Sequence, residues 1–445
     1  MLAIDDLERA GYHTVAIASP DTQGRPVGRT LPLSRFLDDP AAGVDISSYA
    51  LVYDLAGIPL EDSPFAGAHT GYHDIGLRPD LTTLRPYPGV PGTAICIADV
   101  VDAGGNEVSI APRAMLRRQT ELANSAGYEP LMAMELEFYL FHDDLRDARR
   151  RGYRDLEPTT PARSTYGIAA AIAQHPFLFT VSEAMTAAGI PVGSAQTEAG
   201  RGQWEVNLPH TDPLTAADHH LLFKLGVKEL ARQAGHSASF MARPVPDDLG
   251  SSCHIHCSLL CHGAPAFPAE PGSGCLAPVG QHFLGGLLAH LTETAIFFAP
   301  NANSYKRHAP GFAAGGVIAW GMDNRSVAIR VAGHGGSLRL EHRYPGADAN
   351  PYLAATAILA AGLEGITTTR NPGPPIAGDA DAHRDLSRSP ASLGAALAAF
   401  EESSFVREAL GPDTVAHYAA HARAEWTAFL AAVTDWEITR AFEAV

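Results

Sequence analysis

The sequence predicts an α+β protein of two domains, the larger of which is a mixed sheet or barrel packed with helices. A chain of 445 residues is longer than one typical core requires, so two domains are expected. From Met132 onward, strand-like and helix-like segments alternate. Several of these strands carry Glu, His or Arg at every second position, which indicates a sheet curled around a charged cavity.

The composition excludes several classes of function. Hydrophobic residues make up 46% of the chain and charged residues 18%, as in ordinary soluble globular proteins. The formal net charge of -17 argues against a nucleic-acid or anionic-membrane partner. No apolar run reaches the length of a membrane span, the N-terminus shows no secretory leader, and five cysteines do not suggest a disulfide framework. We therefore expect a cytoplasmic enzyme.

Residues 1–108 are expected to form a small α+β domain and residues 109–445 the second domain. The pattern predicts a helix over residues 2–10 and strands over residues 14–18, 50–55 and 94–101. The turn-rich segment 58–92 is long for a loop without regular structure, so it is either functional or contains further strands. Pro112 then opens a predicted helix over residues 113–125.

The second domain is predicted to consist of alternating strands and helices. Strands are expected over residues 131–141, 191–196, 204–207, 238–242, 254–260, 327–331 and 338–343. Helices are expected over residues 177–188, 213–235, 283–298 and 351–364, followed by an Ala-rich helical region over residues 390–442.

The strand over residues 131–141, LMAMELEFYLF, places Glu135, Glu137 and Tyr139 on one face. Two neighbouring carboxylates would be costly to bury unpaired, and their repulsion would push one of them to protonate. A bound cation removes both problems. The alternative is an ordinary strand with this face in water, and the stretch alone leaves that alternative open.

Three further strands repeat the pattern and together supply a set of candidate ligands. The inventory is Glu135, Glu137, Glu198, Glu205, Glu341 and His254. Five carboxylates and one imidazole suit Mg²⁺ or Mn²⁺, and six ligands fit two ions better than one. The arginines nearby in the sequence are Arg307, Arg325, Arg330, Arg339 and Arg343. Two divalent ions beside several arginines could hold polyphosphate and a transferring phosphoryl group.

Two other patterns have competing interpretations. The cysteines and histidines of residues 253–262 could bind zinc, but on a strand the Cys and His side chains point to opposite faces and the spacing lacks a CxxC pair, so buried cysteines are the favoured interpretation. No Walker phosphate-binding motif is present. Residues 333–336, GHGG, are expected to form a hairpin turn.

Six motifs link the chain to a known family: MELEFYL, EAGRGQWEVN, GSSCHIHCSL, NSYKRHAPG, DNRSVAIR and RLEHRYPGADANPYL. With these motifs, in this order, the chain resembles glutamine synthetases of the bacterial type over nearly its whole length. The resemblance implies an N-terminal β-grasp domain and a catalytic α/β funnel, an open barrel of antiparallel strands with outer helices. ATP would enter one end and glutamate the other. It also implies two Mg²⁺ or Mn²⁺ ions per site and a homo-oligomer of hexameric rings, usually a dodecamer, in which neighbouring subunits complete each site.

The resemblance assigns roles residue by residue. It implies that the ion nearer glutamate is held by Glu137, Glu198 and Glu205, and the ion at the ATP phosphates by Glu135, His254 and Glu341. Glutamate would be bound by Arg307, Arg343, Gly250 and Glu198, and the nucleotide by His256, Ser258, Arg339 and Arg330. Arg325, Arg330 and Arg339 would neutralise phosphate charge in the transition state, with Arg325 and Arg330 as catalytic residues. Tyr166, Phe312 and Ala313 would lie at the amine site.

The chain departs from the family's pattern where the amine would bind. Glutamine-forming members read PGYE after NSYKR, and this Glu closes the site and helps to take a proton from ammonium. Here residues 310–313 read PGFA, so the carboxylate is missing. The usual Asn-Gly pair reads Leu249-Gly250, and the ammonium-binding Asp of the family's DGSS has only Asp54 as a near candidate.

Loss of a carboxylate favours an acceptor that is larger and partly apolar. We therefore expect a γ-glutamylamide synthetase: ATP, glutamate and a primary amine would give a γ-glutamylamide, ADP and phosphate through γ-glutamyl phosphate. The alternatives are a true glutamine synthetase with a substituted flap and a non-catalytic relative used as an assembly. All six metal ligands are present, which argues against the latter, because buried carboxylates are costly to keep together.

Overall fold

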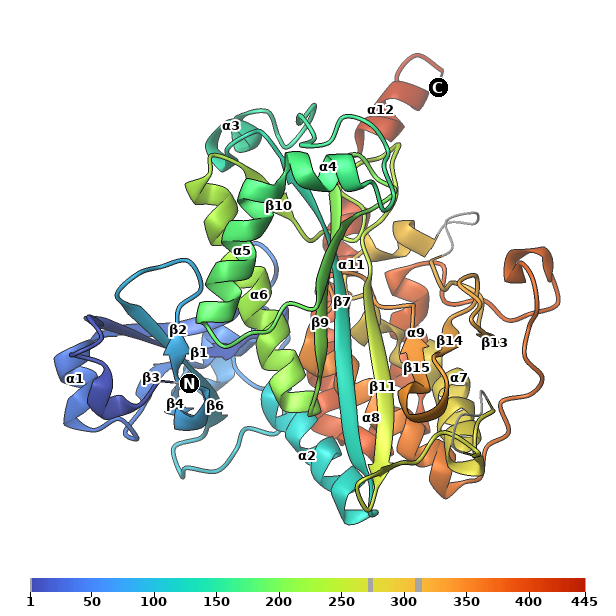
Figure 1. Cartoon of the computed structure of the whole chain (residues 1–445), viewed down its shortest axis with the longest axis horizontal. Coiled ribbons are helices and arrows are strands. Elements are labelled where there is room, and N and C mark those ends of the chain that lie inside the picture. The colour runs from blue at the N-terminus through green and yellow to red at the C-terminus, as the bar shows by residue number, and fades with distance from the viewer. Residues whose placement is uncertain (1, 271–274, 309–313, 445) are drawn as a thin grey trace.

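The computed structural model describes residues 2–270, 275–308 and 314–444, and its described strands form two separate sheets (Figure 1). The smaller sheet, in blue, comes from the first hundred residues and lies at one side of the molecule. The long strands of the larger sheet run through the middle of the view, with helices on both sides. This arrangement confirms the expected α+β class. Among the described residues, no helix combines the length and apolar character that a membrane span needs.

The smaller sheet has the strand order β2-β1-β6-β4-β3, with β5 paired to β6. Its strands are β1 (Thr14–Pro20), β2 (Pro26–Pro32), β3 (Val44–Ser47), β4 (Asp74–Pro79), β5 (Arg85–Pro86) and β6 (Thr93–Val101). The central pair β1 and β6 is parallel, and the other pairs are antiparallel. The short elements beside it are α1 (Leu33–Asp38), η1 (Ile4–Asp6), η2 (Ser48–Leu51), η3 (Ala68–Thr70) and η4 (Leu81–Thr83).

Two sequence predictions in this region are wrong. The helix expected over residues 2–10 is only the 3-10 turn η1 and a hydrogen-bonded turn, which ends at Gly11 with φ +81°. The strand expected over residues 50–55 begins as the 3-10 helix η2, where Ser47 Oγ accepts the Tyr49 N–H. A short buried apolar run does not distinguish a strand from a helical turn. The turn-rich segment 58–92 does contain further strands, β4 and β5.

The larger sheet has the order β13-β14-β15-β11-β7-β9-β8, with β10 paired to β7 and β12 to β11. Its strands are β7 (Glu129–Phe141), β8 (Ser194–Thr197), β9 (Gln203–Thr211), β10 (Ser237–Ser239), β11 (Cys253–Cys261), β12 (Ala264–Pro265), β13 (Trp320–Met322), β14 (Ile329–Ala332) and β15 (Arg339–His342). All pairs are antiparallel except β13 with β14. The order does not return on itself, so β8 and β13 form the two ends of the sheet.

Helices pack around this sheet and close the core. They are α2 (Pro112–Ser125), α3 (Leu145–Arg150), α4 (Ile168–Ala173), α5 (His175–Ala187), α6 (Pro213–Gln233), α7 (Pro278–Phe298), α8 (Pro351–Thr367), α9 (Leu393–Glu402), α10 (Ser404–Leu410), α11 (Pro412–Ala431) and α12 (Asp435–Ala441). The remaining 3-10 segments are η5 (Ser304–His308), η6 (Gly335–Ser337) and η7 (Ala380–Ala382). Helices α2 and α6 contact β7, and α7 contacts β14.

All seven strands predicted for the larger sheet are present, with shifts of a few residues at their ends. The four long helices are present as α5, α6, α7 and α8, and the C-terminal helical region is divided into α9 to α12. The expected turn at residues 333–336 does join β14 to β15. The sequence reading missed the short elements β12, β13, α3 and α4, which are too brief to show a clear period.

Strands β1 and β6 are buried on both faces, which connects the two sheets into one packed unit. Val15 and Cys96 belong to the core of the smaller sheet. Ala16 and Ile95, their neighbours in the chain, belong to the core of the larger one. Alternate residues of one strand point to opposite sides, so the smaller sheet supplies part of the larger core.

A buried arginine of α2 links the smaller sheet to helix α6. Arg113 Nη1 lies 2.6 Å from Asp99 Oδ1 on β6, and its Nη2 lies 2.8 Å from Asp80 Oδ2. The same guanidinium donates to Asp218 of α6 at 3.1 and 3.2 Å, and Tyr352 Oη donates to that carboxylate at 2.6 Å. One guanidinium therefore holds three carboxylates from different parts of the chain.

Replacement of Arg113 by Met should lower the free energy of unfolding by about 3–5 kcal/mol, because it leaves buried carboxylates without their cation. Urea denaturation followed by circular dichroism would measure the change. The matched control is Arg117→Met, since half-buried Arg117 also contacts Asp99 and should cost about 1 kcal/mol. Equal losses in the two variants would contradict a central role for Arg113.

Candidate active site

Strand register brings the candidate ligands together. Glu135 on β7 lies directly opposite His254 on β11 and Asn207 on β9, and Glu137 lies opposite Glu205. One strand further, Glu341 on β15 lies opposite His256. Residues that face each other across an antiparallel pair have Cβ atoms about 5 Å apart. Four strands therefore place their polar faces around one volume, and the solvated-strand alternative for β7 is wrong.

Two sets of side chains could each hold a cation. The ligand atoms of Glu135, Glu205 and His254 lie within 4.8 Å of one another, and so do those of Glu135, His256 and Glu341. Carboxylate oxygens with an imidazole suit a hard divalent ion. This grouping differs from the one expected from the resemblance, because Glu135 is shared between the sets and His256 joins one of them.

The electrostatics of the cluster fit a cation as well. Burial and the charge of Glu198 raise the pKa of Glu137 to about 7. Burial, together with Glu137, Glu135 and Glu198, raises the pKa of Glu205 to about 9, and burial also raises the pKa of Glu198. These carboxyl groups are poorly compensated by the protein itself, and a bound cation would restore their charged forms.

Two other carboxylates of the cluster are compensated by neighbouring bases. Burial alone would raise the pKa of Glu135, but hydrogen bonds with His254 and His256 bring it well below its usual value. Burial likewise opposes ionisation of Glu341, but His254, Arg343 and other bases lower its pKa to about 2. Burial and Arg343 lower the pKa of His254 to about 4, so its ring is neutral at pH 7, as a metal-binding imidazole must be.

At one end of the cluster, a cavity of about 150 Å³ is lined by residues predicted to bind glutamate. The lining includes Glu137, Glu198, Gly250, Arg307 and Arg343. Buried Arg307 is fixed by the carbonyl oxygens of Tyr344 and Arg343, at 3.0 and 3.1 Å. A Cβ on Gly250 would lie 2.6 Å from Arg307 Cγ, so this close approach requires glycine.

At the other end, a second cavity of about 420 Å³ is lined by the residues predicted to face the nucleotide, including His256, Ser258 and Arg339. Arg339 Nε lies 3.1 Å from His256 Nδ1, and His256 Nε2 lies 2.7 Å from Glu135 Oε1. A guanidinium can only donate, so Nδ1 accepts and Nε2 carries the proton donated to Glu135. Glu135 also lines this cavity, which places it within reach of a ligand bound there.

The remaining predicted arginines differ in their surroundings. Arg330 Nη1 donates to Glu341 Oε2 at 2.7 Å, and its guanidinium also pairs with Asp323. Arg343 pairs with the other oxygen of Glu341. The side chain of Arg325 is exposed, and its carbonyl oxygen accepts from Arg343 Nε. Glu341 is thus held between two cations, whereas Arg325 remains available for a ligand.

Of the residues predicted for the amine side, Tyr166 and Asp54 are described, and neither joins this cluster. Tyr166 is 62% exposed and is linked to the site only through its N–H, which donates to the carbonyl of Thr197 beside Glu198. Asp54 caps a turn by accepting the Ile58 N–H at 2.8 Å and lines neither cavity. Phe312 and Ala313 lie outside the described residues.

The structure adds positioning residues that sequence reasoning did not assign. Gln203 Nε2 donates to Glu137 Oε2 and to the Gly250 carbonyl, both at 2.9 Å. Gln196 Nε2 donates to Glu198 and Glu205, at 3.2 and 2.9 Å. Gln203 stands two residues before Glu205, so the two share a face of the strand and the role of Gln203 could have been found from the sequence, whereas Gln196 has no comparable signal.

The zinc alternative receives no support from the geometry. Cys253 and Cys257 point away from the cluster into the core, and burial raises the pKa of both thiols to about 12. A zinc ligand must be a thiolate, which such burial opposes. Among the described residues, neither set of potential metal ligands contains a cysteine.

Residues 109–441 match the family described as glutamine synthetase, catalytic domain. The chain is 39% identical to the γ-glutamylethanolamide synthetase of Streptomyces coelicolor over 431 residues, which covers 97% of this chain and 92% of that protein. It is 35% identical to a glutamate–isopropylamine ligase of a Pseudomonas species over 441 residues, covering 98% and 96%. The solved structure of ligand-free GmaS superposes with a TM-score of 0.86 at 28% identity, covering 99% of both chains.

The metal-free protein should lose stability as the pH rises above neutrality. A raised pKa means that the folded protein holds a proton that the unfolded chain has released, so this contribution is complete below about pH 4.5 and is lost progressively up to about pH 7 for Glu137 and up to about pH 9 for Glu205. Thermal unfolding of the metal-free protein between pH 6 and 10 would measure the loss. Added Mg²⁺ should reverse it and release protons on binding, which calorimetry in buffers of different ionisation enthalpy would detect.

Glu205→Gln provides the control, because an amide cannot ionise. This variant should keep its stability above pH 8 when metal-free, yet bind Mg²⁺ more weakly by about tenfold or more. A pH profile identical to that of the unmodified protein would show that Glu205 does not cause the loss.

Proposed function

This chain belongs to the glutamine synthetase family, and we propose that it is an ATP-dependent ligase that joins the γ-carboxylate of glutamate to an amine larger than ammonia. The observation that carries the choice of acceptor is the sequence PGFA at residues 310–313, which lacks the carboxylate of the glutamine-forming flap. Two relatives that match nearly the whole chain are named for ethanolamine and isopropylamine products or substrates, which supports the same choice.

The two cavities support a two-substrate reaction centred on the carboxylate cluster. We propose that glutamate occupies the smaller cavity, with its carboxylates held by Arg307 and Arg343, and that ATP occupies the larger one beside His256, Ser258 and Arg339. Two Mg²⁺ or Mn²⁺ ions would be held by Glu135, Glu137, Glu198, Glu205, His254 and Glu341. When bound, such ions neutralise phosphate charge and align the phosphoryl group with its acceptor.

The reaction then proceeds in two displacements. A γ-carboxylate oxygen of glutamate attacks the γ-phosphorus of ATP, the bond to ADP breaks, and γ-glutamyl phosphate forms. The amine nitrogen attacks the activated carbonyl, phosphate leaves, and the nitrogen loses a proton. Arg330 and Arg325 would stabilise the charge on the transferring phosphoryl group, and Glu341 would orient Arg330 through its 2.7 Å contact.

The assembly is part of the proposal. Asp54 lies far along the chain from the cluster and lines neither cavity, so it would reach a site only from a neighbouring subunit, as the family resemblance implies. We propose hexameric rings, paired as a dodecamer, with residues 1–108 as the N-terminal domain and residues 109–445 as the catalytic domain. The separate small sheet of the first hundred residues supports this division.

Phosphate release from ATP should require glutamate, Mg²⁺ and an amine, and should be fastest with a small primary amine such as ethanolamine or isopropylamine. The assay would compare these amines with ammonium and a polyamine at equal concentrations of the free base. A rate that is highest with ammonium would return the protein to the glutamine-forming members. ATP turnover absent under every condition would favour the non-catalytic alternative.

Restoring the flap carboxylate should shift the acceptor preference. In Ala313→Glu, the ratio of kcat/KM for ammonium to kcat/KM for the preferred amine should rise by about tenfold or more, because the new charge attracts ammonium and can take its proton. Ala313→Gln is the matched control, since it adds the same volume without the charge. An equal shift in both variants would show that space, and not charge, sets the preference.

A further inference from the structure

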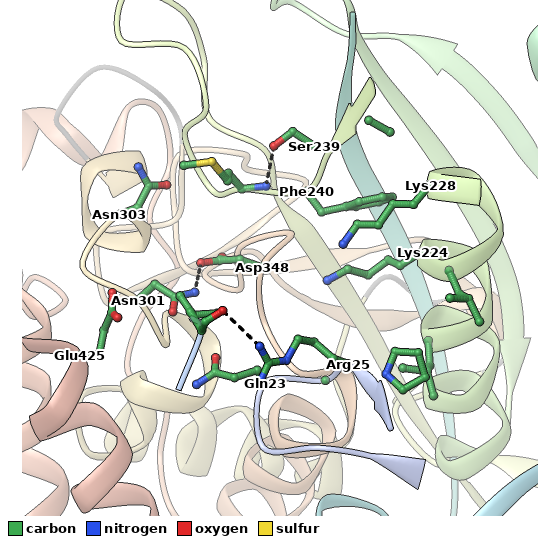
Figure 2. A pocket seen from close by; sticks show the side chains of 17 residues that line it. Gln23, Arg25, Lys224, Lys228, Ser239, Phe240, Asn301, Asn303, Asp348 and Glu425 are labelled. Atoms are coloured by element: carbon green, nitrogen blue, oxygen red, sulfur yellow. Dashed lines mark hydrogen bonds between the residues drawn. The ribbon is translucent and has the colours of Figure 1, made fainter. Parts of the chain in front are cut away.

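A third cavity, of about 570 Å³, lies between the turn that joins β1 to β2 and the face of α6 (Figure 2). Its walls are formed by residues of that turn, by one face of α6, by the segment that follows β10, and by Asn301, Asp348 and Glu425. It shares no lining residue with the two cavities of the active site. Its volume is ordinary for the binding site of a small molecule.

Lysine is rare in this protein and is concentrated at this cavity. The chain has 32 lysine and arginine residues, of which only Lys224, Lys228 and Lys306 are lysines. Two of the three line this single cavity, one helical turn apart on α6. Nearly all positive side chains of this protein are arginines, and two of its three lysines lie in this cavity. An ammonium is a point charge that fits a restricted space, whereas a guanidinium is a planar fork.

Both lysines line the cavity, Lys224 half-buried and Lys228 exposed, and Asp348 is the carboxylate whose charge acts on Lys224. Lys224 Nζ lies 5.3 Å and Lys228 Nζ 5.8 Å from the centre of the Phe240 ring, and Figure 2 shows the two side chains running in the same direction. Lys224 also donates to the Ala347 carbonyl at 2.8 Å. In the described part of the chain, no carboxylate forms an ion pair with either lysine. Like charges one turn apart repel, and burial together with Lys228 lowers the pKa of Lys224 to about 8.

The other charged groups of the cavity make hydrogen bonds of their own, although Oδ1 of Asp348 has no hydrogen-bond partner in the described chain. Arg25 pairs with Asp21 at 2.7 Å and donates to the carbonyls of Asp54 and Leu55. Across the cavity, Asp348 Oδ2 accepts from Asn301 and Ser304, at 2.8 and 2.6 Å, and Glu425 accepts from the Ala302 N–H at 3.4 Å. No ion pair neutralises Lys228 in the described chain, so the α6 side of the cavity is the side that would attract an anion.

We propose that this cavity binds a small organic carboxylate, with its charged group between Lys224 and Lys228 and its apolar part against Phe240 and the leucines of α6. Leu221, Leu225 and Met241 line the same space, so an apolar body finds contact where inorganic phosphate would not. The ligand would contact both the turn of the smaller sheet and α6. Asp348 and Glu425 oppose the binding of a second negative group at the far wall.

Acetylation of the lysines tests this site directly, because mass spectrometry can follow each of the three lysines separately. The full-length protein in its native assembly is treated with a limiting acetylating reagent, with hexanoate, hexanamide or inorganic phosphate at equal ionic strength. At ten times its Kd, hexanoate should slow acetylation of Lys224 and Lys228 by about tenfold, because only the empty fraction reacts. Lys306 serves as the internal reference and should be unaffected.

Unchanged acetylation of Lys224 and Lys228, equal protection of Lys306, or protection by phosphate as strong as by hexanoate would overturn the proposal. Hexanamide should not protect, since it has the same chain without the charge.

Calorimetry with variants separates this cavity from the active site. Lys228→Gln should weaken hexanoate binding by about tenfold, as expected for the loss of one charge-assisted contact. Lys228 makes no hydrogen bond that the fold needs, and Lys306→Gln is the matched control because Lys306 also lies over a phenyl ring, that of Phe429. Displacement of hexanoate by glutamate would place its binding in the catalytic cavity and would overturn the proposal.

Discussion

Mutual repulsion among buried carboxylates is the constraint on which this structure depends. Glu137, Glu205 and Glu341 are each less than a tenth exposed and lie within one group of strands. The protein compensates them unequally. Glu341 forms ion pairs with Arg330 and Arg343, whereas the hydrogen bonds of Glu205 within the described chain come from the amides of Gln196 and Asn207. A cation would be bound most favourably beside Glu205, because no positive side chain pairs with that carboxylate in the described chain. The free energy that it costs to bury these carboxylates together would then favour metal binding.

Strand register explains why the sequence was informative about this cluster. A period of two assigns a face to every residue of a strand, so Glu135 and Glu137 had to lie together. The sequence could not show which strands are neighbours, because the partners of β7 are about 70 and 120 residues away in the chain. For the same reason the grouping of ligands differed from expectation: His256 comes within reach of Glu135 and Glu341 only through the pairing of β11 with β15.

The errors in the first hundred residues have a different origin. The strands β3 and β5 are short, and β2 has no buried residue, so hydrophobic alternation does not distinguish them. Ala50 and Leu51 form a buried apolar run that fits a strand or a helical turn equally well. Tertiary packing decides such segments, whereas the long helices α6 and α8 were correctly predicted because their length and Pro-initiated N-termini are local properties.

The smaller sheet is joined to the rest of the protein by a shared hydrophobic core and by buried ion pairs. Strands β1 and β6 supply side chains to both cores, Arg113 joins Asp80 and Asp99 to Asp218, and Asn350 Nδ2 donates to the carbonyls of Asp21 and Thr22. Helix α6, which carries Asp218 and the two cavity lysines, packs on β7 and β9, the strands of Glu135, Glu137 and Glu205. Helix α6 is therefore the element that contacts both the Arg113 ion-pair network and the strands of the carboxylate cluster.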